Sequence, residues 1–237
     1  MDSRRWRCVS TAGSTGAPAR GSTTTDGWNA LTDVRLTMPM SAAQARSLRV
    51  GDTVLIDGDI VVSAGLPTYQ RIAEYVREGR ELPIDMAHGV LFHLGSYSRE
   101  TAAGGLEVLY INPTTSTRFN PLMPDIIRGL GLHAVGGKGG LDAACASAMQ
   151  EAGCVYLSFP GGASALLSEA LREVRQVAWP ELLTHYRLVK LRVEGLGPAT
   201  VGIDAHGNSI YDGLQARAKQ RLPEILDALA LDRAASE

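Results

Sequence analysis

The second half of the chain alternates short apolar runs with helical stretches, and this rhythm limits the possible fold more than any other feature. The pattern predicts helices at 123–130, 141–152 and 163–171, interleaved with strands at 134–135, 155–159, 189–193 and 200–203. Strands that alternate with helices are typical of a layered α/β domain. We therefore predict an α/β fold.

The first half is richer in strands. We predict strands at 34–39, 53–56, 60–63, 90–94 and 108–111, and helices at 41–48 and from Pro67 onward. Asp57-Gly58-Asp59 separates two β-branched runs and is a hairpin signal. The runs 90–94 and 108–111 are expected to be buried, with a polar loop at 99–105 between them.

A long helix is predicted at the end of the chain, over 211–231. Pro223 is expected to kink or restart it. Its apolar stripe comprises Leu214, Ala218, Leu222, Ile225 and Leu229.

Composition bounds the domain and its partners. Of the 237 residues, 45% are hydrophobic and 20% are charged, which is typical of a soluble globular protein. Residues 1–33 are rich in Ser, Thr, Gly and Ala, so we predict a disordered extension there and one domain over 34–237. A net charge of −2 predicts neither nucleic-acid nor membrane binding, and we expect a cytoplasmic protein.

The three cysteines, Cys8, Cys145 and Cys154, match no zinc or disulfide spacing. Cys145 lies in an Ala-rich helical stretch and Cys154 opens an apolar run, so both are expected to be buried thiols. We therefore predict no metal site in this chain, and no ligand set for an iron–sulfur cluster.

A hydroxyl-rich loop follows the predicted strand at 108–111. Asn112 and Pro113 lead into Thr114-Thr115-Ser116-Thr117-Arg118. The carboxyl ends of strands are where open α/β sheets bind ligands, and an arginine can hold a carboxylate or phosphate with two hydrogen bonds. Two interpretations are open: an anion-binding loop, or a threonine-rich turn that caps the next helix.

Gly136-Gly137-Lys138-Gly139-Gly140 also lies between a strand and a helix. Glycines let backbone amides approach an anion, and Lys138 adds a full charge. The spacing is not that of a nucleotide P-loop, so an anion site or a tight turn are the alternatives. A third glycine turn, 159–163, and the pair Asp204 and His206 are explained at least as well by structural roles.

Taken together, these segments resemble one family. Pro113-Thr114-Thr115-Ser116-x-Arg118, Gly137-Lys138-Gly139-Gly140 and Asp204-x-His206-Gly207-Asn208 follow one another as in the class I fumarase C-terminal domain and the L(+)-tartrate dehydratase beta subunit. Gly51-Asp52 and Phe92-His93-x-Gly95 are also similar. The resemblance covers about residues 34 to 230.

The resemblance implies a swivelling β/β/α domain with a central mixed sheet. It implies a hydro-lyase that adds or removes water on a hydroxy-dicarboxylate, with a [4Fe-4S] cluster on a partner alpha subunit rather than on this chain. Thr114 corresponds to the acid/base group, and Arg118 and Lys138 to the residues that bind substrate carboxylates. Further residues are expected to bind substrate or to support the site: Thr115, Ser116, Gly137, Gly139, His93, Asp204 and His206.

The chain departs from the family pattern at one important segment. Where the family carries Arg-Asp-x-x-His, this chain has Ala64-Gly65-Leu66-Pro67-Thr68, and Gly95-Ser96 replaces a Gly-Pro. This implies a reduced anion clamp, with either a less charged or bulkier substrate or a loss of hydratase activity. Two alternatives to the hydro-lyase subunit are a stand-alone isomerase or cyclase without a cluster, and a non-catalytic partner subunit.

Overall fold

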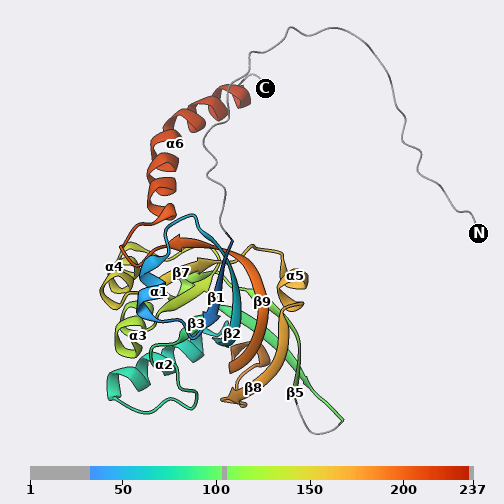
Figure 1. Ribbon diagram of the computed structural model, residues 1–237. Helices are drawn as coiled ribbons and strands as arrows, with labels where there is room; N and C mark the ends of the chain where they lie inside the picture. Colours follow the sequence, from blue (N-terminus) through green and yellow to red (C-terminus); the bar gives the residue numbers. More distant parts are fainter. Residues whose placement is uncertain (1–32, 103–105, 235–237) are drawn as a thin grey trace, which may run out of the picture. The chain divides into compact units, whose positions relative to one another are not determined.

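Strand β9 organises the main sheet because it pairs with three other strands. In the computed structural model, which describes residues 33–102 and 106–234, β9 (Leu188–Ile203) runs antiparallel to β2, β7 and β8. The other strands of this sheet are β1 (Asp33–Met38), β2 (Thr53–Val62), β3 (Val90–Phe92), β6 (Ala134–Gly137), β7 (Val155–Ser158) and β8 (Leu171–Ala178). Their order is β1-β2-β3-β6-β7-β9-β8. Because β9 also pairs with β2, the strands β2, β3, β6, β7 and β9 form a closed ring of neighbours (Figure 1).

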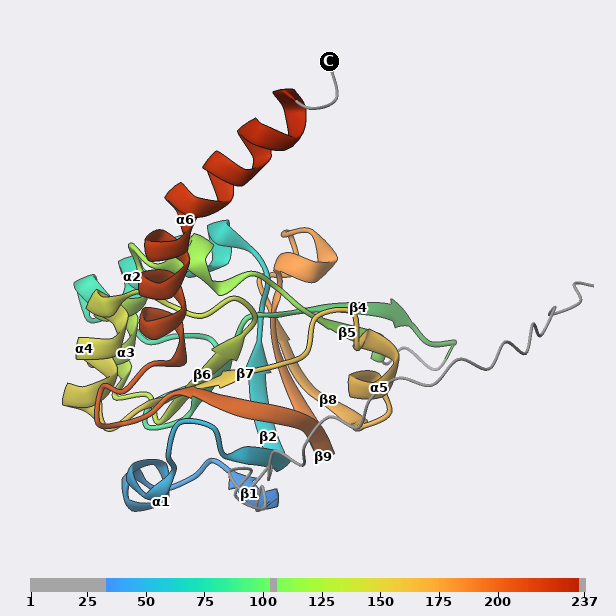
Figure 2. The same cartoon turned by 90° about the horizontal axis from the view of Figure 1, so that it is seen from above.

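Helices cover one face of this sheet. Figures 1 and 2 both show α2 (Leu66–Glu78), α3 (Met123–Leu130) and α4 (Ala143–Ala152) on the same side. The remaining elements are α1 (Ala42–Ser47), α5 (Ser164–Ser168), α6 (Ile210–Ala234), the 3-10 turns η1 (Ser116–Phe119) and η2 (Thr184–Tyr186), and a separate two-stranded sheet of β4 (Leu94–Glu100) and β5 (Leu106–Pro113).

Two apolar clusters lie on the two faces of the sheet, because successive side chains of a strand point to opposite faces. Phe92 and Leu157 belong to the first cluster, which also contains residues of β4 and β5. Leu91 and Tyr156 belong to the second, which the apolar faces of α2, α3 and α4 cover. The α/β class and the central mixed sheet that the sequence predicts are confirmed.

Several predicted boundaries are also confirmed. The helix predicted at 123–130 is α3, and α1 begins after Ser41, whose hydroxyl accepts a hydrogen bond from the amide of Gln44. Cys145 and Cys154 are buried, as expected. Of the extension predicted at 1–33, only Asp33 lies within the described residues, and there it opens β1; Cys8 lies outside them.

The hairpin predicted at Asp57-Gly58-Asp59 is wrong. β2 continues through these residues without a turn. A β-bulge in the pairing with β9 falls here, and Gly58 has a φ of +107°. A Cβ at Gly58 would lie 2.2 Å from the carbonyl oxygen of Met38 on β1. The glycine thus permits a close strand contact at a bulge rather than a reversal of the chain.

Replacing Gly58 by alanine should therefore destabilise the fold strongly. The change combines backbone strain of about 1–3 kcal/mol with a steric clash of about the same size. Gly51→Ala is the matched control, because Gly51 has a φ of +97° but no atom within 4 Å of the place that a Cβ would take. Urea unfolding should show Gly58→Ala losing about 1–3 kcal/mol more than Gly51→Ala. Equal losses would show that the β1–β2 contact is not tight.

Other differences come from strand boundaries. The run 90–94 is divided at His93 between β3 and β4, and 189–193 and 200–203 belong to the single strand β9. The run 108–111 is a strand, but Leu109 and Tyr110 are exposed rather than buried, because β5 pairs only with β4. The helix predicted at 163–171 is the shorter α5, and Leu171 begins β8.

The terminal helix forms, but its apolar stripe does not pack on the domain. α6 runs through Pro223 without an interruption. From Asp212 onward, each side chain that the structure describes is exposed. Tyr211 attaches the start of the helix to the domain: a Cβ at Gly140 or at Gly202 would lie within 2.7 Å of its side chain. Among the described residues, no helix is long and apolar enough to cross a membrane.

Candidate active site

The carboxyl ends of three parallel strands meet at one edge of the sheet. β3, β6 and β7 are neighbours and run in the same direction. His93 follows β3, Lys138 follows β6 and Phe159 follows β7. The amide of Phe159 donates to the carbonyl of Gly137 at 2.8 Å, which continues the ladder beyond the strand ends. Open α/β sheets bind ligands at such an edge.

The chain leaving β5 enters between the ends of β3 and β6. The amide of Thr114 donates to the carbonyl of His93 at 2.8 Å, and the amide of Lys138 donates to the carbonyl of Thr114 at 3.0 Å. The amide of Ser116 then donates to the carbonyl of Lys138 at 2.8 Å. These main-chain bonds bring together the hydroxyl-rich loop and the glycine–lysine loop, which are separate in the sequence.

A hydroxyl and two cations gather on these loops. The Arg118 guanidinium donates from Nη2 to the Thr114 Oγ1 at 3.3 Å. Lys138 is half-buried, and a Cβ at Gly161 in the third glycine turn would lie 3.6 Å from its Cδ. Within the described part of the chain, neither Arg118 nor Lys138 has a salt-bridge partner, whereas Arg128 pairs with Glu151 at 2.6 Å. The two charges are therefore available for an anion.

Glycines allow the loops to approach so closely. A Cβ at Gly137 would lie 2.3 Å from the Ser116 Oγ and 2.9 Å from the His93 Cβ. Gly139 is exposed, with a φ of +83°, and a Cβ there would meet only the Cγ2 of Thr115 at 3.6 Å. Gly137 is thus required for packing beneath the loops, whereas Gly139 shapes an exposed turn beside Thr115.

Ser116 lies beneath the loop and does not face solvent. Its side chain is fully buried, and its Oγ is 2.8 Å from the hydroxyl of Tyr156. The amide of Gly140 donates to the same Tyr156 hydroxyl at 3.3 Å. Burial raises the pKa of Tyr156, so this hydroxyl stays neutral. Tyr156 thereby ties the two loops together from the helix-covered face of the sheet, and the sequence analysis did not identify it.

His93 is buried directly beneath the same loops. Its ring packs against Tyr69 at 5.2 Å and Phe119 at 4.8 Å, measured between ring centroids. Neither ring nitrogen has a hydrogen-bond partner among the described residues. Burial, and secondarily the charge of Arg118, lower the pKa of His93 to about 3. The side chain is therefore neutral at physiological pH.

Asp204 and His206 are not brought to this edge. β9 is antiparallel to β7, so the end of β9 lies near the start of β7. Asp204 accepts hydrogen bonds from the amides of His206 and Asn208, at 2.9 and 3.1 Å, and so holds a turn. The His206 Nε2 lies 2.9 Å from the carbonyl oxygen of Arg46. The structural interpretation of this pair, as the residues of a turn, fits these contacts.

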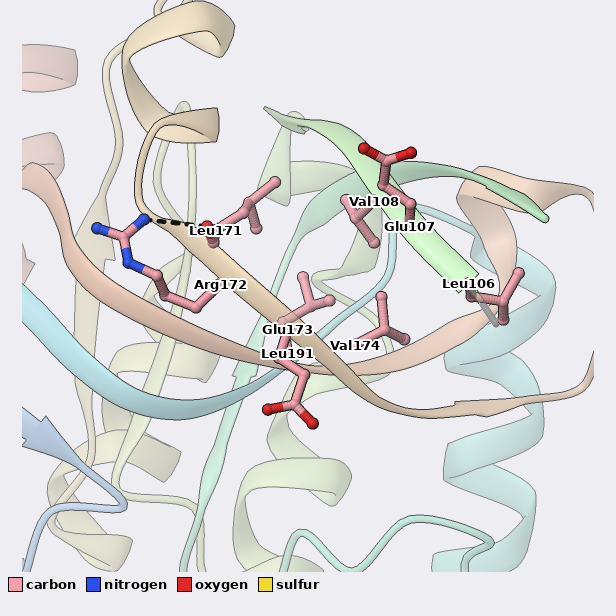
Figure 3. A pocket seen from close by; sticks show the side chains of 8 residues that line it. All are labelled: Leu106, Glu107, Val108, Leu171, Arg172, Glu173, Val174 and Leu191. Carbon is pink, nitrogen blue, oxygen red and sulfur yellow. Dashed lines mark hydrogen bonds between the residues drawn. The ribbon is translucent and has the colours of Figure 1, made fainter. Parts of the chain in front are cut away.

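A cleft of about 340 Å³ lies elsewhere, between β5 and the strands β8 and β9. Figure 3 shows Leu106, Val108, Leu171 and Val174 along it, with the charged ends of Glu107, Arg172 and Glu173 pointing away. Arg172 pairs with Glu194 at 3.0 Å, so its charge is neutralised. The residues that line the cleft include no predicted site residue and offer no free cation to a carboxylate.

Comparison with known proteins gives the family. The sequence profile described as "Fumarase C-terminus" matches residues 12–214. This chain belongs to that family. A Methanocaldococcus jannaschii protein provisionally named L(+)-tartrate dehydratase subunit beta is 30% identical over 79% of this chain and 95% of its own length. The L(+)-tartrate dehydratase subunit beta of Escherichia coli K12 is 30% identical over 74% of this chain and 85% of its own length.

A longer relative shows the same domain within a larger chain. A Geobacillus stearothermophilus protein provisionally named class I fumarate hydratase is 31% identical over 81% of this chain. The match spans 36% of that longer protein. The match to the Fumarase C-terminus profile ends at residue 214, so most of α6 lies beyond it.

The segment at 64–68, which we expect to depart from the family pattern, packs against residues 185 and 186. A Cβ at Gly65 would lie 2.5 Å from the Cβ of Tyr186. The hydroxyls of Ser63 and Thr68 both donate to the carbonyl of Tyr186. The neighbouring His185 is exposed, and its Cβ lies 3.6 Å from where a Cβ of Gly95 would be. Tyr186 therefore packs closely on the segment at 64–68, and His185, which was not singled out from the sequence, lies beside it.

The iron–sulfur cluster that the Fumarase C-terminus resemblance implies does not fit the described residues of this chain. Cluster ligands are thiolates. Burial raises the pKa of both Cys145 and Cys154, which keeps them as thiols. Among the described residues, no group of three or more His, Cys, Asp or Glu side chains is placed to hold a metal ion.

Proposed function

We propose that this chain is the beta subunit of an iron–sulfur-dependent hydro-lyase that adds or removes water on a hydroxy-dicarboxylate of the fumarate/malate or tartrate type. The relatives named as tartrate dehydratase beta subunits and as a class I fumarate hydratase support this proposal. The observation that carries it is that Thr114, Arg118 and Lys138 lie on two adjoining loops at the ends of strands. Arg118 donates to the Thr114 hydroxyl, and neither Arg118 nor Lys138 has a salt-bridge partner among the described residues.

Each part of the loops has a proposed task. Arg118 and Lys138 bind the substrate carboxylates, because charge-assisted hydrogen bonds give both affinity and orientation. Thr115 and the exposed backbone at Gly139 border the same surface and complete the binding site. Ser116 and Gly137 are buried, so we assign them to holding the loops in position rather than to touching substrate.

Thr114 is proposed to move the proton. Its Oγ1 accepts a hydrogen bond from Arg118, and a positive charge beside an oxygen favours negative charge developing on it. Elimination of water requires a proton to be removed from one carbon, and addition of water requires a proton to be delivered to it. A hydroxyl polarised in this way can do either.

The remaining chemistry is proposed to come from a partner. The relatives named as beta subunits support an alpha partner, and we propose that this partner carries a [4Fe-4S] cluster and that the complex lies in the cytoplasm. When bound there, the cluster would supply the Lewis acid. Because the segment at 64–68 carries no cation and packs against Tyr186, we propose that this chain contributes only Arg118 and Lys138 to the carboxylate clamp.

Replacing Lys138 by methionine tests this assignment in the complex of both subunits. The change removes the charge but keeps most of the stem. Loss of one charge-assisted hydrogen bond costs about 1.5–3 kcal/mol, so affinity for a small dicarboxylate should fall about tenfold to a hundredfold. Calorimetry under anaerobic conditions measures the dissociation constant, and turnover of fumarate or tartrate reports activity.

Lys190→Met is the matched control, because Lys190 lies within β9, opposite Val61, and belongs to neither loop. It should bind the dicarboxylate as the wild type does. Equal affinities of the two variants would remove Lys138 from the site. Turnover by the isolated chain in the presence of an iron chelator would contradict the two-subunit proposal.

A further inference from the structure

The glycine–lysine loop ends in two glycines whose own backbone does little to fix its path. Gly139 has a φ of +83° and Gly140 a φ of +80°. The preceding residue is held, because the Lys138 amide donates to the carbonyl of Thr114 and its carbonyl accepts from the amide of Ser116. Glycine has more backbone freedom than any other residue. The path from Lys138 into α4 therefore depends on the contacts that Gly140 makes with other parts of the chain.

Two tyrosines contact Gly140. Its amide donates to the hydroxyl of Tyr156 at 3.3 Å. The ring of Tyr211, at the start of α6, packs on the same residue: a Cβ at Gly140 would lie 2.6 Å from the Cγ and the Cδ2 of that ring. The two tyrosine rings also meet edge to face, with their centroids 5.9 Å apart. The ring of Tyr211 thus occupies the space that a side chain at position 140 would need.

The same ring also packs on the main sheet. A Cβ at Gly202 on β9 would lie 2.7 Å from the hydroxyl oxygen of Tyr211 and 2.9 Å from its Cε2. Burial raises the pKa of Tyr211, so the side chain is neutral at physiological pH. Tyr211 therefore touches both the glycine–lysine loop and β9, and it links the position of the loop to the sheet.

The turn after β9 places Tyr211 against Gly202. Asp204 holds this turn through the main-chain amides that it binds, and Ile203 and Ser209 form a β-bridge across it. The Ser209 hydroxyl then accepts a hydrogen bond from the amide of Tyr211 at 3.2 Å. The chain therefore reverses after β9 and returns Tyr211 over the strand that it has just left. This gives the turn an effect on the loop, although its own residues do not reach the site edge.

We propose that Tyr211 is a positioning residue, which fixes the glycine–lysine loop so that Lys138 is held where it binds a substrate carboxylate. Tyr211 acts through Gly140 and does not touch the substrate. The proposal rests on the proposed function for the ligand of Lys138, but the contact between Tyr211 and the loop can be tested without any ligand.

Hydrogen exchange of the full chain, followed by mass spectrometry, tests the contact. Tyr211→Ala should raise the exchange rate of the amides at 138–141 by about tenfold or more, because Gly140 loses the ring that packs on it. Tyr211→Phe keeps the ring and should exchange as the wild type does. Tyr75→Ala is the matched control: Tyr75 is also half-buried and meets Trp179 edge to face at 5.9 Å, but it lies on α2 and belongs to neither loop. It should leave this exchange unchanged.

Gly202→Ala tests the link from the sheet to the loop. The three atoms nearest to a Cβ at Gly202 all belong to Tyr211, so an alanine there should displace the ring and raise the exchange of a loop that it does not touch. In the Tyr211→Ala background the same alanine should add nothing, because the ring is already absent. A further increase in the double variant would show that Gly202 acts on the loop by another route, against the proposal.

Binding to the complex of both subunits tests the consequence. Tyr211→Ala should weaken the affinity for fumarate or tartrate by about threefold to tenfold, because Lys138 is present but its loop must be ordered on binding. KM should rise with little change in kcat, since the contact of Lys138 serves binding rather than the chemical step. Tyr211→Phe and Tyr75→Ala should both bind as the wild type does.

Three results would overturn the proposal: wild-type exchange and affinity in Tyr211→Ala, an equal loss in Tyr75→Ala, or an equal loss in Tyr211→Phe, which would assign the effect to the hydroxyl. A wild-type complex that binds neither dicarboxylate would contradict the proposed function instead. The exchange rates would then decide by themselves whether Tyr211 fixes the loop.

Discussion

Replacing Thr114 by valine should lower turnover by about a hundredfold or more, because it removes the hydroxyl while keeping the shape of the side chain. The main-chain bonds of Thr114 with His93 and Lys138 remain, so the loops should keep their positions. Substrate affinity should change much less than the rate, since Arg118 and Lys138 are still present. A loss in kcat with little change in Kd is the signature of a group that acts in the chemical step.

Two variants make this result interpretable. Thr114→Ser restores a hydroxyl at the same position and should recover a large part of the rate. Thr117→Val removes a neighbouring, exposed hydroxyl and should leave the rate unchanged. All three are measured in the complex of both subunits. If the Thr114→Val complex turns over substrate at the wild-type rate, Thr114 is not the acid/base group. The resemblance of its loop to the family would then indicate a shared fold and not a shared catalytic role.

Sequence patterns predicted that the hydroxyl-rich and glycine–lysine loops follow strands, because the signals for these loops are local. A hydroxyl-rich segment and a glycine–lysine turn each follow a strand, and parallel strands bring such segments to one edge. What lies beneath the loops has no local signal. Tyr156 sits within an apolar run, and its contact with the Ser116 hydroxyl at 2.8 Å joins residues 40 positions apart. Only the tertiary structure shows that Ser116 points inward.

The missed strand β8 has a specific cause. Its apolar residues Leu171, Val174 and Val177 are three apart, which is a helical spacing rather than the alternation of a strand. Two register shifts in its pairing with β9 fall between these residues. Each bulge adds one residue and returns the next apolar side chain to the same face. The three side chains therefore all pack on the first apolar cluster, and a helix-like sequence forms a strand.

The stripe on α6 is the opposite case. The helix itself was predictable from its spacing of apolar residues, and it forms. Periodicity shows which side of a helix is apolar, but it cannot show whether the partner lies in the same chain. Here the domain contacts end at about Tyr211, and the stripe that the sequence identifies is exposed.

Replacing His93 by leucine should change how stability depends on pH. The pKa of His93 is about 3 in the folded protein, mainly because of burial, against an ordinary value of 6.5 in the unfolded chain. The unfolded state therefore binds an additional proton between these values. The lowered pKa of His93 therefore adds to the free energy of unfolding of the wild type. This added stability is complete above about pH 6.5 and is lost as the pH falls toward 3, by about 1.4 kcal/mol per pH unit. The leucine variant has no such group and should lack this part of the slope.

At neutral pH the same variant should be as stable as the wild type or more stable. Both ring nitrogens of His93 are buried without partners among the described residues, and an unsatisfied buried polar group costs about 1–3 kcal/mol. Leucine removes that cost and has a similar volume among the rings of Tyr69 and Phe119. Urea unfolding at several values between pH 4 and pH 8 measures both effects. His185→Leu, the same exchange at an exposed side chain, should keep the wild-type slope. If His93→Leu keeps that slope as well, or loses stability at pH 7, the ring has a hydrogen-bonded partner in solution. The assignment of His93 as a neutral side chain without a partner beneath the two loops would then be wrong.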